Sequence, residues 1–117
     1  MDKVAVIIND APYGTEKPWN ALRLAKALVA TKQNVTICLV GDGVSLIKKG
    51  QKPPKGFYNL GSMLEELISM GAEAIACRTC TDARGLDESE FIGKVTVGGF
   101  MSHLARLISE GAKVVSF

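Results

Sequence analysis

Short apolar runs recur along the chain and are separated by longer stretches with a helical pattern. Val4–Ile8 is apolar throughout, as expected of a strand that is covered on both faces. Val35–Val40 is a second run, mostly apolar and interrupted by Thr36, and three shorter runs follow it at Ala74–Cys77, Val95–Val97 and Val114–Phe117. The hydrophobic pattern therefore predicts five strands.

The interval after the first run reads as an amphipathic helix that begins near Glu16. Leu22, Ala25 and Val29 fall on one face of such a helix, opposite its polar residues. Pro18 suits the first turn, where a backbone N–H is not needed.

A second helix has both a start signal and a stop signal. Ser62 and Glu65 have the S-x-x-E spacing of a capping box, and Gly71 stands at the expected C′ position. The apolar stripe between these signals consists of Met63, Leu64, Leu67 and Ile68.

A last helix is predicted from about Phe100 to Glu110. Its inward face is predicted to carry Phe100, Leu104 and Ile108, and its outward face His103, Arg106 and Glu110. Earlier in the chain, the turn Gly41-Asp42-Gly43 could open a further short helix, and Lys48–Gly56 reads as an exposed loop.

Strand and helix alternate over the whole length, which predicts an α/β fold with a mostly parallel sheet and helices on both faces. At 117 residues we expect a single domain, residues 1–117. In such sheets the reactive group usually lies outside the carboxyl ends of the strands. Three loops leave those ends: Asn9–Thr15, Gly41–Val44 and Cys77–Gly85.

Composition narrows the class of protein. Hydrophobic content of 47% and charged content of 22% are typical of a globular domain. A formal net charge of +2 is too small to favour nucleic acid or an anionic membrane as partner. The longest apolar run has five residues, far fewer than the roughly 20 that span a bilayer. With no secretory signal and three cysteines, we expect a cytoplasmic protein with thiol chemistry.

The sequence C-R-T-C, Cys77 to Cys80, follows a predicted strand and is the main chemical signal. A thiolate is a nucleophile, and nearby cations such as Arg78 and Arg84 favour the thiolate form. Gly85 allows a sharp turn after the loop. Cys77 is also at the end of an apolar strand, where a buried thiol is common.

Two other interpretations of the cysteine pair stay open. The C-x-x-C spacing also occurs in dithiol redox switches, although Gly85 leaves no room for the long helix of a disulfide oxidoreductase. A third interpretation is structural zinc, which needs four ligands, and the chain has only Cys38 and one histidine, His103, to add to the pair. A zinc site between subunits is a further alternative. We expect no metal, and we interpret Cys38 as a core side chain.

Supporting residues are predicted around this loop. They are Arg78, Asp82, Arg84 and Gly85 from the loop itself, and Asn9 and Tyr13 from the loop after the first strand. The chain has neither G-x-G-x-x-G nor G-x-x-x-x-G-K-[ST], so we expect no nucleotide cofactor.

The order and spacing of these features resemble the DsrE/DsrF/TusD family of small sulfur-relay proteins, including its YchN-like members. The similarity rests on Gly41–Val44 (G-D-G-V), the strand leading to Cys80, Arg84 with Gly85, and the closing A-K-V-V-S-F. It covers essentially the whole chain.

The resemblance implies a three-layer α/β/α sandwich with a five-stranded parallel sheet that assembles as a homotrimer or homohexamer. It also implies a cysteine persulfide after the third strand, at Cys80, with sulfur donor and acceptor proteins as partners. Cys77 is an additional thiol relative to the sulfur-relay members, and our hypothesis is that it resolves the persulfide. The alternatives are an oligomeric binding or scaffold module without enzymatic activity, and a C-x-x-C redox sensor.

Overall fold

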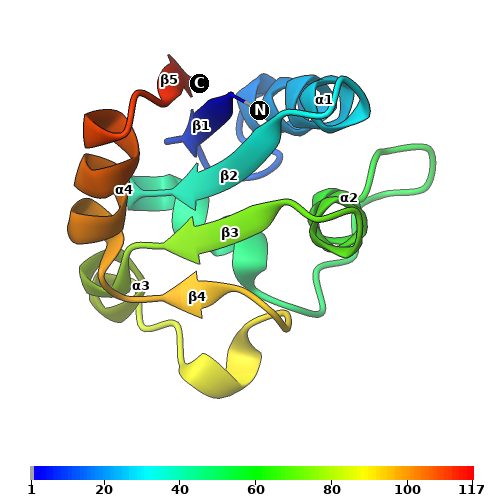
Figure 1. The fold of residues 1–117 in the computed structure, drawn as a ribbon. Coiled ribbons are helices and arrows are strands. Elements are labelled where there is room, and N and C mark those ends of the chain that lie inside the picture. Colours follow the sequence, from blue (N-terminus) through cyan, green and yellow to red (C-terminus); the bar gives the residue numbers. More distant parts are fainter. Residues whose placement is uncertain (1) are drawn as a thin grey trace.

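The computed structural model describes residues 2–117 and contains one sheet in which every strand is parallel (Figure 1). The strands are β1 (Lys3–Ile8), β2 (Asn34–Leu39), β3 (Glu73–Ala76), β4 (Thr96–Val97) and β5 (Lys113–Ser116). Their order in the sheet is β4-β3-β2-β1-β5. The predicted α/β fold with a five-stranded parallel sheet is therefore confirmed.

The central strands form the core because their apolar residues are covered on both faces. Val6 and Ile8 of β1 are fully buried, as are Ile37 and Leu39 of β2, which pair with them in register. Continuous apolar strands of this kind are characteristic of parallel sheets that lie between helices.

Helices connect the strands and form the outer layers. They are α1 (Lys17–Ala30), α2 (Leu60–Ser69), α3 (Arg78–Ala83) and α4 (Phe100–Ser109), with 3₁₀ segments η1 (Gly41–Ile47) and η2 (Glu88–Glu90). The helices α1 and α2 pack against each other, and α1 contacts β1 and β2. The chain then crosses the sheet in the opposite direction, from β4 to β5. Because crossovers between parallel strands are right-handed as a rule, this change of direction puts α4 on the face opposite α1.

The start of α2 differs from its prediction. The N-cap is Asn59, whose side chain accepts a hydrogen bond from the Ser62 amide at 3.0 Å, and the helix begins at Leu60. The predicted Ser62–Glu65 capping box is therefore wrong. Asparagine is as good an N-cap as serine, and the apolar Leu60 is fully buried in the core, which favours the earlier start. Gly71 stands at the C′ position as predicted, with φ +106°.

The inward face of α4 also differs in part. Phe100 is buried as predicted, but Leu107 is buried beside it and Ile108 is 53% exposed. Each helical step turns the side chain by about 100°. The buried line therefore runs through Phe100 and Leu107, and Ile108 points away from the sheet.

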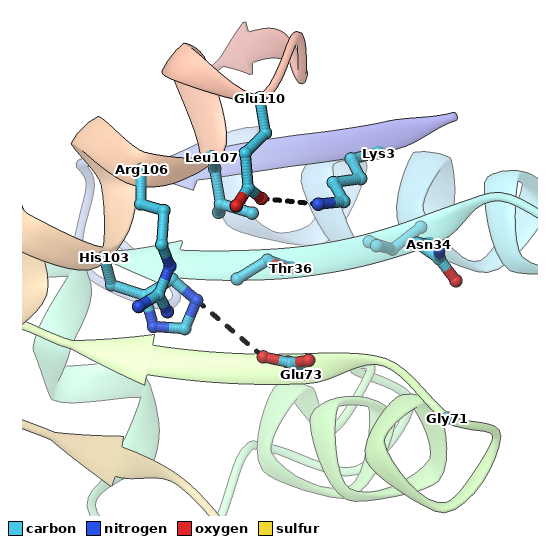
Figure 2. A pocket seen from close by; sticks show the side chains of 10 residues that line it. Lys3, Asn34, Thr36, Gly71, Glu73, His103, Arg106, Leu107 and Glu110 are labelled. Carbon is cyan, nitrogen blue, oxygen red and sulfur yellow. Dashed lines mark hydrogen bonds and ion pairs between the residues drawn. The ribbon is translucent and has the colours of Figure 1, made fainter. Parts of the chain in front are cut away.

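Beside α4, a groove of about 350 Å³ lies over the amino-terminal ends of β1, β2 and β3 (Figure 2). Lys3 pairs with Glu110 across it, and His103 Nε2 lies 3.8 Å from a Glu73 carboxylate oxygen. The predicted outward orientation of His103 is wrong, because its half-buried side chain turns over the sheet toward Glu73.

The segment after α3 contains the single 3₁₀ turn η2. Asp87 caps η2 and forms a capping box with Glu90, whose backbone carbonyl accepts the Lys49 amide at 2.8 Å. The Ile92 amide likewise donates to the Ile47 carbonyl. These bonds fasten residues 87–92 to the end of η1.

Within residues 2–117, every helix is too short or too polar to cross a bilayer.

Candidate functional site

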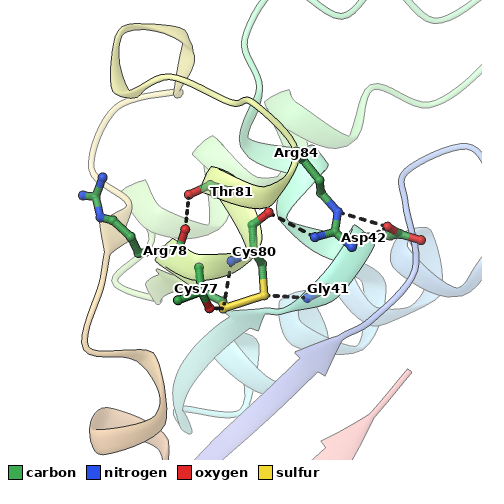
Figure 3. Close-up of a disulfide and its surroundings, with 8 residues drawn as sticks. Gly41, Asp42, Cys77, Arg78, Cys80, Thr81 and Arg84 are labelled. Atoms are coloured by element: carbon green, nitrogen blue, oxygen red, sulfur yellow. Dashed lines mark hydrogen bonds and ion pairs between the residues drawn. A yellow bond between two sulfur atoms is a disulfide. The ribbon is translucent and has the colours of Figure 1, made fainter.

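Cys77 and Cys80 lie where β3 ends and α3 begins. Cys77 is the N-cap of α3 in an extended conformation, and Cys80 lies within the helix (Figure 3). Their Cα atoms are 5.2 Å apart and their sulfur atoms form a disulfide. This Cα separation is within the range that a disulfide spans without backbone movement. The predicted loop at the carboxyl end of β3 is thus a short helix, and the two sulfur atoms are adjacent.

The two sulfur atoms differ in burial and in partners. Cys77 is 7% exposed, and its Sγ accepts the Cys80 amide at 3.3 Å and lies 3.1 Å from Thr79 Oγ1. Cys80 is half-buried, and its Sγ accepts the Gly41 amide at 3.3 Å. Each sulfur atom therefore faces an N–H donor, which stabilises negative charge on sulfur.

The Gly41 amide reaches Cys80 because η1 crosses closely over the end of β1. A Cβ atom on Gly43 would lie 2.2 Å from the Ile8 carbonyl oxygen, so only glycine fits there. The Gly43 amide also donates to the Asn9 carbonyl at 3.2 Å. Gly41 itself has φ +58°, in the left-handed region that glycine adopts readily.

Arg84 connects α3 to η1. Its Nε and one terminal nitrogen donate to Asp42 Oδ1 at 3.0 and 2.7 Å, and its other terminal nitrogen donates to the Cys80 carbonyl at 3.0 Å (Figure 3). The guanidinium is thus bound to the Cys80 backbone and the Asp42 carboxylate. Gly85 follows with φ +68° and ends the helix.

Arg78 lies on the other side of α3 and points away from the sulfur atoms in Figure 3. It donates to the Val97 carbonyl at 3.1 Å and lies 3.7 Å from a Glu88 carboxylate oxygen. Its contacts join α3 to β4 and η2.

The other predicted supporting residues have contacts elsewhere. Asp82 is exposed on α3, and its carbonyl accepts the Gly85 amide at 3.0 Å. Asn9 donates through its side-chain nitrogen to Ser116 Oγ and to the Phe117 carbonyl, each at 2.9 Å. The Tyr13 hydroxyl accepts the Leu60 amide at 3.0 Å, so it caps α2. Among all the predicted supporting residues, it is Arg84 whose side chain hydrogen-bonds to Cys80, at the Cys80 carbonyl oxygen.

Cys38 is fully buried in β2, and burial raises the pKa of its thiol to about 12. Its interpretation as a core side chain is confirmed. Over residues 2–117, the structure gathers no three His, Cys, Asp or Glu side chains that could hold a metal ion.

Three contributors were missed as site residues: the Gly41 amide, the Asp42 carboxylate and the Thr79 hydroxyl. Gly41 and Asp42 stand in the G-D-G-V turn, directly after the strand β2, which neighbours β3 in the sheet. Adjacent parallel strands end at the same edge of a sheet, so this turn and the cysteines are brought together. Thr79 stands between the cysteines, but the sequence has no signal for its contact with Cys77.

Known proteins are similar to this chain over its whole length. A model of the DsrE/DsrF-like family matches residues 2–117. An uncharacterized protein of Methanopyrus kandleri is 40% identical over 117 residues, which are all of this chain and 95% of that protein. A TusC homolog of Aliivibrio fischeri is 29% identical over 91 residues, covering 75% of this chain and 76% of that one.

The protein YchN of Escherichia coli is 38% identical over 119 residues and is covered completely, as is this chain. Its crystal structure aligns over the full length of both chains with a TM-score of 0.91. A structure of a Methanobacterium thermoautotrophicum protein of unknown function, 17% identical, shares the fold with a TM-score of 0.82. The chain therefore belongs to the DsrE/DsrF-like family, which its sequence resembles.

Proposed function

We propose that the protein is a cytoplasmic sulfur carrier that holds sulfane sulfur as a persulfide on Cys80 and passes it to an acceptor thiol. The observation that carries this proposal is the setting of Cys80 at the carboxyl edge of the sheet. Its half-buried Sγ accepts the Gly41 amide. The match to a TusC homolog supports a sulfur-relay role.

In the loading step, the Cys80 thiolate attacks the outer sulfur of a donor persulfide, R–S–SH. A new S–S bond forms at Cys80 Sγ, the donor S–S bond breaks, and the donor leaves as a thiolate. The sulfane sulfur moves with no net redox change. One thiolate and one persulfide are consumed, and one persulfide and one thiolate are formed. The Gly41 amide stabilises the attacking anion.

In the unloading step, an acceptor thiolate attacks the terminal sulfur of Cys80–S–SH and takes it, and Cys80 leaves as a thiolate. Arg84 supports both steps by holding the Cys80 carbonyl and the Asp42 carboxylate together. It thereby keeps η1, and with it the Gly41 amide, against the sulfur atom.

Intact-protein mass spectrometry tests this proposal. The reduced protein is mixed with glutathione persulfide and quenched with an alkylating agent after a short incubation. We expect wild type and Cys38→Ala to gain the mass of one sulfur atom that a reductant removes, and Cys80→Ser to gain none. Sulfur gain by Cys80→Ser that is absent from Cys77→Ser would assign the carrier role to Cys77.

A dithiol redox switch is the second candidate, and the disulfide between Cys77 and Cys80 favours it. Such a switch needs both thiols and no sulfur donor, whereas a scaffold module needs neither thiol. Mild oxidation that removes two hydrogens from wild type, together with no sulfur loading from the donor, would support the switch over the carrier.

We further propose a homotrimeric or homohexameric assembly. Support comes from apolar side chains that α4 and β5 leave to solvent: Met101 is 66% exposed, Ile108 53% and Val114 45%. Exposed apolar groups gathered on neighbouring elements are typical of surfaces that associate. Light scattering that finds a monomer at micromolar concentration would contradict this assembly.

A further inference from the structure

We infer that Cys77 gives the protein a second activity, the release of hydrogen sulfide from the Cys80 persulfide when no acceptor takes the sulfur. This activity rests on the proposed loading of Cys80. The Cys80 persulfide would then persist only until Cys77 reacts with it.

The first argument is that Cys77 is placed to react with Cys80 and shielded from external donors. Only 7% of Cys77 is exposed, whereas Cys80 is half-buried at the surface of the site. The Cα separation of 5.2 Å lets the two sulfur atoms bond while α3 keeps its form. A donor therefore meets Cys80 first, and the persulfide it leaves is in reach of Cys77.

The second argument is that the surroundings of Cys77 favour an attacking thiolate. The Thr79 hydroxyl lies 3.1 Å from Cys77 Sγ, and the Cys80 amide donates to the same atom at 3.3 Å. Thiolates carry out thiol exchange, and hydrogen bonds to sulfur stabilise them. Cys77 Sγ thus has two polar partners that can donate to sulfur, whereas the buried Cys38 Sγ donates to the Thr36 carbonyl.

The step balances in atoms and electrons. The Cys77 thiolate attacks Cys80 Sγ, which is the inner sulfur of the persulfide, and the terminal sulfur leaves as HS⁻. A Cys77–Cys80 bond forms as the Cys80–S bond to the terminal sulfur breaks. The sulfane sulfur is reduced to sulfide, and the two cysteines are oxidised to a disulfide. A cellular dithiol must then reduce the disulfide before another sulfur atom can be loaded.

The test follows one turnover of the reduced full-length chain. The protein is loaded with glutathione persulfide, the donor is removed by rapid desalting, and free sulfide and intact mass are measured over time. We expect wild type to release one sulfide per loaded chain and to end two hydrogens lighter than the reduced protein. Cys77→Ser keeps its persulfide on the order of tenfold longer or more. Serine is a good N-cap, so this variant retains the start of α3.

Thr79 provides a finer test of the same step. Thr79→Val removes the hydroxyl beside Cys77, and we expect it to slow sulfide release without reducing the amount of sulfur loaded. Thr79→Ser retains the hydroxyl, and we expect it to restore the wild-type rate. Cys38→Ala is the matched thiol control and releases sulfide like wild type.

The outcomes separate this inference from the proposed carrier function. If Cys77→Ser and Cys77→Ala load sulfur but lose it as fast as wild type, the sulfide-release step is wrong and the carrier function stands. If wild type and both Cys77 variants fail to load sulfur, the carrier function is wrong and the inference falls with it. Equal release by Thr79→Val and wild type would remove Thr79 from the step.

Discussion

The Gly41 amide donates a hydrogen bond to Cys80 Sγ over 3.3 Å, although the two residues stand 39 positions apart. Gly41 follows β2 and Cys80 follows β3, and these strands are neighbours in the sheet. The contact therefore exists because two parallel strands end at the same edge. It places a neutral donor, rather than a cationic side chain, at the sulfur atom that we propose as the carrier.

Gly43→Ala is expected to disturb both the fold and this contact. The added methyl group would lie 2.2 Å from the Ile8 carbonyl oxygen, so η1 must move away from β1. We expect a loss of about 1–3 kcal/mol in unfolding free energy, as for other overpacked sites. We also expect slower alkylation of Cys80, because the Gly41 amide moves with η1. Urea unfolding and timed alkylation measure the two effects.

Gly93→Ala is the matched control for this substitution, because a Cβ atom there meets nothing within 4 Å. We expect it to leave both the unfolding midpoint and the alkylation rate near those of wild type. Equal behaviour of the Gly43 and Gly93 variants would contradict the close approach of η1 to β1.

Asp42→Asn is expected to weaken the link between η1 and α3. The side chains of Arg84 and Asp42 are 33% and 68% exposed, so loss of their charge pairing costs only ~0.2–1 kcal/mol of stability. We expect the effect on sulfur loading to exceed the effect on stability, since Arg84 also hydrogen-bonds to the Cys80 carbonyl. We expect slower persulfide formation by Asp42→Asn in a timed mass assay.

Lys26→Met serves as the control for Asp42→Asn. It removes another exposed ion pair, that with Glu66 at 3.1 Å, on the α1–α2 side of the molecule. A similar small loss of stability with an unchanged loading rate is expected. If both variants load sulfur as fast as wild type, the Asp42–Arg84 pair does not position Cys80.

The fold could be predicted because its signals are local. Apolar runs such as Val4–Ile8 mark buried parallel strands, and the alternation with helices fixes the class of fold. Boundaries were less certain where two residues give similar signals. Asn59 and Ser62 are both good N-caps, and burial of Leu60 in the core favours the former.

The site could be predicted only as far as chain position determines contacts. The cysteine pair and its place after β3 were visible, but the targets of the arginines were not. Arg84 meets Asp42 across 42 positions, whereas Arg78, two residues before Cys80, turns toward Val97. The direction of each side chain follows from its place around α3 and from packing against η1 and β4, which sequence proximity does not reveal.

Cys38 is expected to resist alkylation at pH 8 while Cys80 of the reduced protein reacts. Burial raises the pKa of Cys38 to about 12, so its thiol stays protonated in the folded state. Unfolding exposes it and returns its pKa to an ordinary value, so its contribution to stability is complete at neutral pH and is lost as pH rises toward 12. We expect Cys38→Ala to lose less stability than wild type between neutral and alkaline pH. Identical alkaline losses would contradict the raised pKa.

Lys3→Met is expected to destabilise the protein at neutral pH but not in acid. The hydrogen bond and charge of Lys3 lower the pKa of Glu110. A carboxyl whose pKa is lowered by folding contributes stability above its unfolded pKa, and this contribution is lost as pH falls through the folded value. Unfolding measured from pH 7 into acid should show the two proteins converging. A difference that stays constant with pH would contradict the pairing.

The central claim is that Cys80 Sγ is the atom that accepts the sulfane sulfur. Peptide mapping of the loaded Cys77→Ser chain tests this claim most directly. In this variant the persulfide has no neighbouring thiol to remove it. The reduced protein is treated with glutathione persulfide, alkylated, digested and sequenced by tandem mass spectrometry. We predict one additional sulfur atom, alkylated, on Cys80 and none on Cys38. Sulfur on Cys38, or on neither cysteine of the folded variant, would contradict the account.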